Sequence, residues 1–191
     1  MNNYKIVFMG TPDFGIPSLN ELYKQGYEVE AVYTQPDRVN KRGNKVQFSA
    51  VKQFALEHDI TIYQPNSLKD EKELDVLRAL NPDLIIVIAY GKILPQAVLD
   101  IPKYGVINVH ASLLPKYRGA APVQRSIIDG EETTGVTIMQ LDAGMDTGNI
   151  IAEKSVFITP HMTSEDLFDV LSNVGAKLLI DVLDDLPAKL A

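Results

Sequence analysis

The first half of the chain alternates short apolar runs with amphipathic stretches, and this alternation constrains the fold more than any other feature. Three runs rich in β-branched residues have strand length: 5–9, 29–33 and 84–89. The stretches between them carry apolar residues at helical spacing: 16–25, 50–58 and 72–80, with Gly26 and Pro82 as stops. We therefore expect parallel strands joined by right-handed helical crossovers, which is a doubly wound α/β fold with helices on both faces of the sheet.

The second half of the chain continues this pattern. Three more strands are expected: 106–110, 135–140 and 150–157. Residues 164–183 have the apolar spacing of a long terminal helix, and Thr163 is suited to cap it. A chain of 191 residues fits one domain, and nothing after Leu186 forms another.

Composition excludes several classes of site. The chain has no cysteine, which removes disulfides, thiolate catalysis and Cys-based zinc sites. Its three histidines are well separated in the sequence, so no metal is expected. No apolar run approaches the roughly 18 residues of a membrane span. The net charge of −7 argues against a generally nucleic-acid-coated surface. We expect a cytoplasmic monomer.

A glycine-rich turn follows the first expected strand. Gly10 and Gly15 have the spacing of a phosphate-binding loop, but the Lys and Ser/Thr of that motif are missing. No Gly-x-Gly-x-x-Gly occurs either, so an NTPase or dehydrogenase is rejected. Gly10 suits a tight strand-to-helix turn with close backbone approach to a ligand, and a turn glycine alone is the alternative.

The residues with catalytic potential lie between 108 and 148. Asn108 and His110 are two apart on an expected strand, so their side chains share a face. A satisfied core pair is the alternative, but the small-residue turn at 111–112 favours a ligand site at the carboxyl edge of the sheet. Asp146 lies in a glycine-punctuated loop, where an Asp is more often a turn residue. Together, the amide, imidazole and carboxylate predict acyl transfer.

These motifs resemble a known family. Asn108-x-His110, the run 112–119 and the segment 146–148 are similar to the formyltransferases that use 10-formyltetrahydrofolate. Four further segments resemble the members that formylate initiator methionyl-tRNA: 9–14, 34–38, 89–91 and 118–122. The resemblance covers nearly the whole chain. It implies a Rossmann-like catalytic domain over residues 1–191, with 10-formyltetrahydrofolate as the formyl donor and no metal.

The resemblance also implies the site residues. Asn108, His110 and Asp146 are the expected catalytic residues: the first two would stabilise the developing oxyanion, and Asp146 would stabilise the imidazolium and accept a proton from the attacking amine. The main chain of two segments would hold the folate: Ile88, Ala89, Tyr90 and Gly91, and Met139, Gln140, Leu141, Asp142 and Ala143. A third segment would close the pocket: Ser112, Leu113, Leu114 and Pro115.

One basic stretch departs from the acidic balance of the chain. Residues 34–54 contain five cations and one acid, which give a net charge of +4. Because the whole chain has a net charge of −7, the remaining residues carry −11. A solvated loop is the usual fate of such a run, but in the tRNA-formylating relatives the matching insertion contacts the tRNA, and phosphate contacts would explain the charge. The expected acceptor contacts are Gly10, Thr11, Arg38, Lys41, Arg42 and Lys45.

The relatives that act on methionyl-tRNA continue into a linker and a second, basic β-barrel domain that is absent from this sequence. We expect an excised catalytic domain with intact folate binding and weakened tRNA affinity, and a natural short form is the alternative. Two other functions stay open. One is a formyltransferase for an amino sugar or another small amine, and the other is a non-catalytic folate-binding module.

Overall fold

The computed structural model describes residues 3–39, 43, 45–113, 122–142 and 148–190. In these ranges seven strands form one sheet and two more form a hairpin. The strands are β1 (Lys5–Gly10), β2 (Glu28–Tyr33), β3 (Arg38–Val39), β4 (Val46–Gln47), β5 (Thr61–Tyr63), β6 (Leu84–Ile88), β7 (Val106–His110), β8 (Thr133–Gln140) and β9 (Ile150–Phe157). The helices are the 3-10 helix η1 (Asp13–Gly15), α1 (Ile16–Lys24), α2 (Ala50–Glu57), α3 (Glu71–Leu80), α4 (Gln96–Leu99), α5 (Pro122–Ile128), α6 (Ser164–Asp184) and α7 (Leu186–Leu190).

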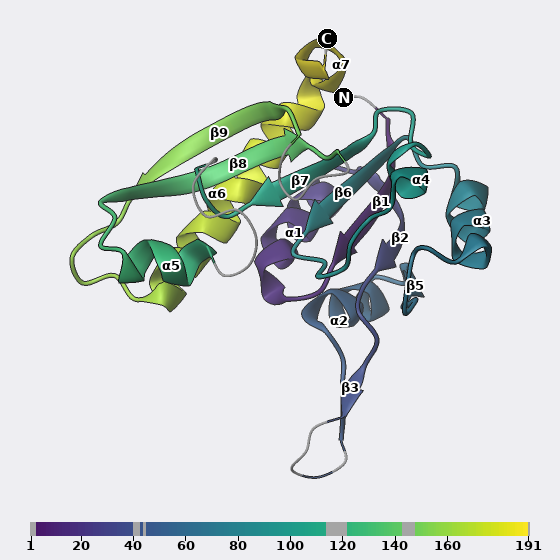
Figure 1. The fold of residues 1–191 in the computed structure, drawn as a ribbon, viewed down its shortest axis with the longest axis horizontal. Helices are drawn as coiled ribbons and strands as arrows, with labels where there is room; N and C mark the ends of the chain where they lie inside the picture. Colours follow the sequence, from purple (N-terminus) through teal and green to yellow (C-terminus); the bar gives the residue numbers. More distant parts are fainter. Residues whose placement is uncertain (1–2, 40–42, 44, 114–121, 143–147, 191) are drawn as a thin grey trace.

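The sheet has the strand order β5-β2-β1-β6-β7-β8-β9 (Figure 1). The strands from β5 to β7 run parallel, whereas β8 is antiparallel to both β7 and β9. The chain moves outward from β1 to β2 and β5 and then returns to add β6 on the other side of β1. The boundary between β1 and β6 is therefore a topological switch point. This arrangement confirms the predicted doubly wound, mostly parallel fold.

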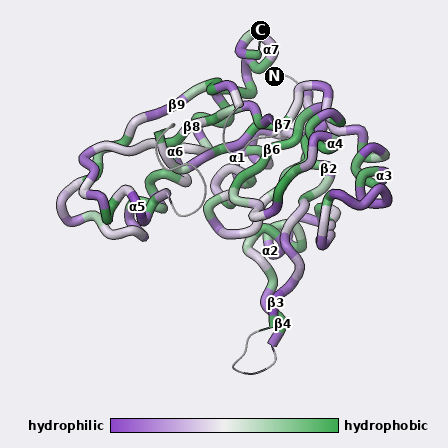
Figure 2. The backbone as a smooth tube through the Cα atoms, viewed as in Figure 1, coloured by the Kyte–Doolittle hydropathy of each residue, from purple (hydrophilic) through white to green (hydrophobic). Residues whose placement is uncertain are grey.

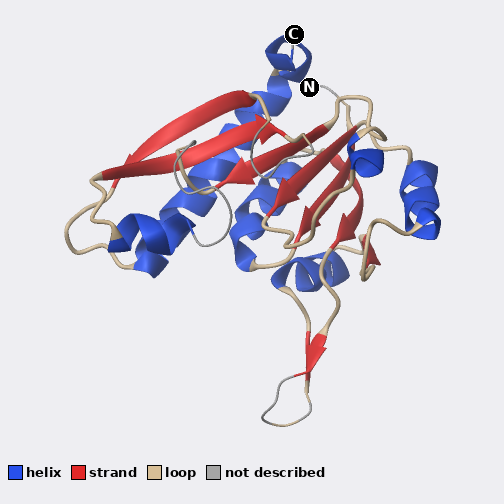
Figure 3. Cartoon of the chain, in the orientation of Figure 1, coloured by secondary structure: helices blue, strands red, loops and turns tan. Residues whose placement is uncertain are grey.

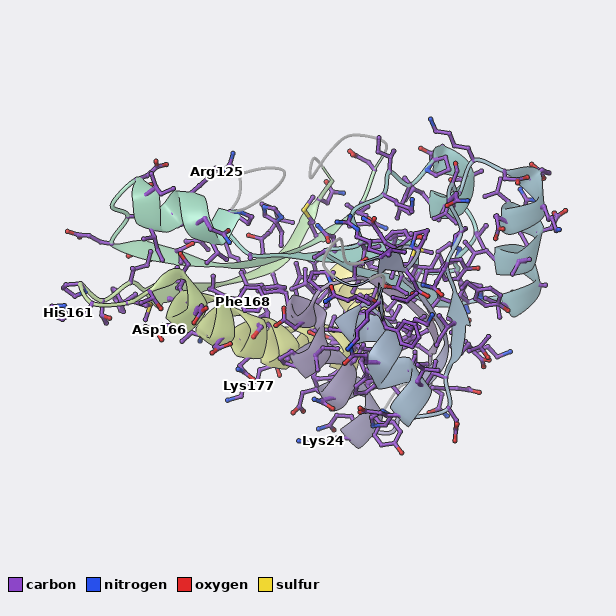
Figure 4. The ribbon with its side chains drawn as sticks, turned by 90° about the horizontal axis from the view of Figure 1, so that it is seen from below. Lys24, Arg125, His161, Asp166, Phe168 and Lys177 are labelled. Atoms are coloured by element: carbon purple, nitrogen blue, oxygen red, sulfur yellow. The ribbon has the colours of Figure 1, made fainter. Side chains whose placement is uncertain are left out.

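Helices cover both faces of the sheet (Figure 3). On one face α1, α2 and α6 bury side chains such as Ile86 and Ile107. On the other face α3 and α4 bury the alternate residues, such as Ile85 and Val106. Figure 2 shows hydrophobic residues along the central strands. In Figure 4, α6 runs along β8 and β9, with its exposed Lys177 pointing away from the sheet. The apolar alternation of each strand thus divides the core into two layers.

Local capping determines where the helices begin and end. α6 starts at a capping box, in which the Thr163 hydroxyl accepts from the Asp166 N–H at 3.1 Å and the Asp166 carboxylate accepts from the Thr163 N–H at 3.0 Å. The predicted helix 164–183 extends by one residue, to Asp184. α3 ends at Leu80, as predicted, and is capped by Asn81, whose φ of 48° is left-handed, just before the predicted stop at Pro82.

The β3–β4 hairpin projects from the body of the domain (Figure 1). Its strands pair Arg38 with Gln47 and Val39 with Val46, and all four residues are exposed. Two short strands of the predicted basic stretch thus form an exposed hairpin, and residues 40–42 and 44 lie outside the described residues. Among the described helices, none combines the length and the apolar character that a membrane span needs.

Candidate active site

The candidate active site lies where β6 turns away from β7. The last residues that these strands pair are Val87 and Asn108, after which β7 continues to His110 while β6 ends at Ile88. Ala89 then takes a φ of 52°, which is left-handed and bends the chain out of the strand direction. The divergence lies beside the switch point between β1 and β6, where sheets of this kind bind ligands.

Asn108 and His110 are brought together on one face of β7. In the antiparallel pairing with β8, Asn108 lies opposite Met139 and His110 lies opposite Thr137. Directly opposed residues share a face, so these four side chains form one patch on two neighbouring strands. Asn108 and His110 are each only 8% exposed. An amide and an imidazole in such a water-poor place can stabilise developing negative charge more strongly than in water.

The segment that follows β7 is tied back to β8. The Thr137 hydroxyl donates a buried hydrogen bond of 2.6 Å to the Ser112 carbonyl. The Leu113 side chain lies against Gly135, where a β-carbon would come within 2.7 Å of it. These contacts fix the start of the segment predicted to close the folate pocket. Its other two members, Leu114 and Pro115, lie outside the described residues.

The loop predicted to carry the catalytic carboxylate is closed at its base. The Gln140 N–H donates to the Asn149 carbonyl at 2.8 Å. Gly148 packs so closely on the Gln140 carbonyl that a β-carbon there would clash with its oxygen. Since Gln140 follows Met139, both ends of this loop lie close to the position opposite Asn108. Asp146 itself, and Ala143 of the predicted folate pocket, lie outside the described residues.

The residues just before this loop also show where the chain leaves β8. The Leu141 N–H donates to the carbonyl of Val106, the first residue of β7, at 2.8 Å. Leu141 is half-buried and Asp142 is exposed, so the chain emerges here from the sheet. The predicted folate segment 139–142 therefore begins opposite Asn108 and runs toward the amino end of β7.

The other predicted folate segment, 88–91, is a turn at the carboxyl end of β6. Ala89 and Gly91 are exposed and Tyr90 is buried. Gly10 lies beside this turn, because a β-carbon on it would approach the Ile88 carbonyl oxygen to 2.7 Å. The close approach at Gly10 is thus to the protein's own backbone. The Thr11 hydroxyl, predicted to contact the acceptor, donates to the Tyr90 carbonyl at 2.9 Å.

A polar clamp holds the base of the hairpin. Lys52 on α2 donates to the Asp37 carboxylate at 2.8 Å and to the Gln64 side-chain oxygen at 3.0 Å. The Gln64 amide donates in turn to Asp37 at 2.7 Å. These hydrogen bonds, first that from Lys52 and then that from Gln64, hold the pKa of the Asp37 carboxyl below its usual value. Lys52 is therefore occupied by Asp37, whereas Arg38 and Lys45 of the basic stretch are exposed.

Sequence reasoning assigned no role to Gln35, Gln64 or Thr137. Gln35 lies within the segment that carried the resemblance, which was its one signal in the sequence. Gln64 and Thr137 gain their roles from contacts with residues that are distant along the chain.

Within the described residues, no three His, Asp or Glu side chains gather into a metal site.

A separate cleft of about 290 Å³ lies between α1, α2 and the amino ends of β2 and β5. It is lined by Tyr23, Glu30 and His58, among others, and it contains none of the predicted site residues. The amino ends of these strands form the edge of the sheet opposite the switch point, so this cleft is not the candidate active site.

The fold and the site define a class of protein. The family model described as formyl transferase matches residues 4–183, and the chain belongs to this family. Methionyl-tRNA formyltransferase of Clostridium perfringens (strain SM101 / Type A) is 56% identical over 177 residues, which cover 92% of this chain and 57% of that protein. Methionyl-tRNA formyltransferase of Legionella pneumophila (strain Paris) is 49% identical over 191 residues, which cover all of this chain and 61% of that protein. The chain thus spans about three fifths of the length of these relatives.

Solved structures support the fold independently. Phosphoribosylglycinamide formyltransferase from Streptococcus pneumoniae superposes with a TM-score of 0.78 at 20% identity, covering 96% of this chain and 98% of that one. The enzyme of the same name from Bacillus halodurans gives a TM-score of 0.76 at 23% identity, covering 97% and 93%. At such identities the likeness establishes the Rossmann-like formyltransferase architecture and not the substrate.

Proposed function

We propose that this chain transfers a formyl group from 10-formyltetrahydrofolate to the amino group of methionine on initiator methionyl-tRNA, a step in the initiation of protein synthesis. The observation that carries the proposal is the buried pair Asn108 and His110 on one face of β7, beside the switch point, in a member of the formyl transferase family. The identity of about half the residues with relatives named methionyl-tRNA formyltransferase supports the acceptor.

Two features of the described residues support a folate as the donor. Ala89 and Gly91 of the 88–91 turn are exposed, and the apolar side chain of Met139 is buried opposite Asn108. Pockets for flat heterocycles combine such apolar walls with a few fixed polar groups. We assign the donor to the main chain of the 88–91 turn and of the 139–142 segment.

The chemistry follows from the groups present. The methionine amine attacks the formyl carbon, and the Asn108 amide and the protonated His110 imidazole donate hydrogen bonds to the oxyanion that develops. Asp146 accepts the proton that the amine loses, directly or through water, and stabilises the imidazolium. The tetrahedral intermediate then collapses: the bond between the formyl carbon and the folate nitrogen breaks, that nitrogen takes up the proton that Asp146 accepted, and tetrahydrofolate departs while the formyl group stays on the amine.

The acceptor side is assigned to the hairpin. Arg38 and Lys45 are exposed on it, and with Lys41 and Arg42 they give an acidic chain one concentrated basic element. Phosphate contacts by such cations orient a nucleic acid without reading its sequence. We propose that residues 1–191 form the catalytic domain, and that it acts in the cytoplasm as a monomer.

Formyl transfer to charged initiator methionyl-tRNA tests the proposal. The native chain is compared at high enzyme concentration with His110→Ala and with the control His161→Ala, which removes an exposed imidazole at the far end of the molecule (Figure 4). We expect His110→Ala to lower turnover roughly a hundred- to thousand-fold, as loss of one oxyanion donor does elsewhere. His161→Ala should match the native chain.

The same assay separates the alternatives. Transfer to a nucleotide-linked amino sugar with none to methionyl-tRNA would replace the proposed acceptor with a small amine. Folate binding without turnover on any amine would leave only a binding module. Equal activity of His110→Ala and the native chain would remove His110 from the mechanism.

A further inference from the structure

The 88–91 turn has a backbone conformation that needs support. Ala89 has a φ of 52° and Gly91 a φ of 84°. Residues with a β-carbon rarely adopt the left-handed region, so Ala89 tends to relax unless its surroundings hold it. In the proposed function this turn presents its main chain to the folate. Whatever holds the turn therefore also shapes the donor pocket.

The carbonyl groups of the turn are held by residues from two neighbouring strand ends. The Thr11 N–H donates to the Ala89 carbonyl at 3.2 Å, and the Thr11 hydroxyl donates to the Tyr90 carbonyl at 2.9 Å. The Gln35 side-chain amide donates to the carbonyls of both Tyr90 and Gly91, each at 3.2 Å. Gln35 thus contacts two successive peptide groups and fixes the plane of each.

The ring of Tyr90 holds the turn from its core side. It is 1% exposed, and burial raises the pKa of its hydroxyl to about 12. Tyr90 points into the core formed with α3 and α4, whereas Ala89 and Gly91 on either side are exposed. The buried Tyr90 ring therefore holds the turn against the core, and the side-chain amide of Gln35 fixes the orientation of its peptide groups.

Gln35 is itself held in place by both of its backbone groups. Its N–H donates to the Thr11 hydroxyl at 3.3 Å. Its carbonyl accepts from the Gln64 amide at 3.1 Å, and Gln64 belongs to the clamp with Asp37 and Lys52 at the base of the hairpin. The side chain that orients the turn therefore extends from a backbone segment that is braced on both sides.

We propose that Gln35 is a positioning residue for the formyl donor, which holds the 88–91 turn in its folate-binding conformation. The inference rests on the proposed function, since it takes 10-formyltetrahydrofolate as the ligand of this turn. Gln35 acts on the donor through the turn and need not touch the reacting atoms.

The test replaces Gln35 by Glu and by Ala and measures calorimetric binding of 10-formyltetrahydrofolate to the chain without acceptor. Glu keeps the size of the side chain, but an ionised carboxylate only accepts hydrogen bonds and faces two carbonyl oxygens here. We expect both variants to weaken donor binding about tenfold, the order expected from losing two neutral hydrogen bonds. In the transfer assay KM for the donor should rise by a similar factor while kcat stays within about twofold, because Asn108 and His110 are untouched.

Gln53→Ala is the matched control, because the Gln53 amide also donates to a main-chain carbonyl, that of Phe48 at 3.3 Å, away from the turn. It should bind the donor as the native chain does. Amide hydrogen exchange at Thr11, whose N–H donates to the Ala89 carbonyl of the turn, should accelerate in the Gln35 variants without ligand, and not in Gln53→Ala. Donor affinity of Gln35→Glu within twofold of native would overturn the inference while leaving the proposed function intact. Failure of the native chain to bind the donor would overturn the proposed function.

Discussion

The hydrogen bond between Thr137 and Ser112 is the best placed single interaction for a mutation at the residue scale. Thr137 is fully buried, and its hydroxyl donates to the Ser112 carbonyl at 2.6 Å. Thr137→Val keeps the shape and removes this buried hydrogen bond. We expect a loss of about 0.5–1.5 kcal/mol in the free energy of unfolding, measured by denaturant titration.

Thr133→Val, at the exposed start of the same strand, should change the free energy of unfolding by less than about 0.5 kcal/mol. Equal effects of the two substitutions would mean that β propensity, and not the buried hydrogen bond, decides the stability at position 137.

Residue-scale prediction from the sequence worked where the chemistry is local. The two-residue period of a strand suffices to place Asn108 and His110 on one face, and the structure has them there. Gln35 and Gln64 could not be assigned in this way. Their partners lie 55 and 29 residues away, and only the parallel strand pairing brings those partners close.

At the scale of elements, the clamp at the base of the hairpin makes the stability of the folded chain depend on pH. Its hydrogen bonds lower the pKa of the Asp37 carboxyl in the folded chain, so the clamp adds stability above the unfolded pKa of about 3.8, and this is lost as pH falls through the lower folded pKa. Asp37→Asn should lower Tm at neutral pH by roughly 1–3 °C, as expected for a partly exposed ion pair.

The Tm difference between the native chain and Asp37→Asn should then close as pH is lowered past the native pKa. Asp181→Asn, an exposed site on α6, is the control and should show no such convergence. A difference that persists unchanged in acid would mean that Asp37 acts through its shape and not its charge.

Elements were predictable in proportion to their length. The 21-residue α6 shows enough apolar repeats and a clear cap, so its start is found and its end is missed by one residue. The three-residue β5, the four-residue α4 and the β3–β4 hairpin are too short to show a period. The antiparallel direction of β8 and β9 also depends on tertiary pairing, which apolar patterns do not encode.

At the scale of the whole molecule, the carboxyl edge of the sheet gathers part of the predicted chemistry. The switch point brings the end of β1 next to the 88–91 turn, and β7 brings Asn108 beside the same turn. This convergence follows from topology, which the β-α-β alternation does predict. The distribution of charge also favours one side of the molecule for tRNA binding, because the basic hairpin projects from an otherwise acidic body.

The charge distribution predicts a steep salt dependence for binding of initiator tRNA. Each phosphate contact contributes about 0.7–0.9 to the slope of log affinity against log salt concentration. Replacing the four hairpin cations Arg38, Lys41, Arg42 and Lys45 by Gln should therefore flatten the slope by about 3. Replacing Lys24, Lys72, Lys103 and Lys177 by Gln changes the net charge equally, from −7 to −11, at exposed sites elsewhere on the surface.

Filter binding between about 50 and 200 mM salt measures both slopes. Because counterion release depends on contacts and not on net charge, the control variant should keep the native slope while losing some affinity through general repulsion. Equal slopes for the two variants would show that tRNA does not contact the hairpin, and the acceptor would then have to reach Asn108 and His110 across another surface.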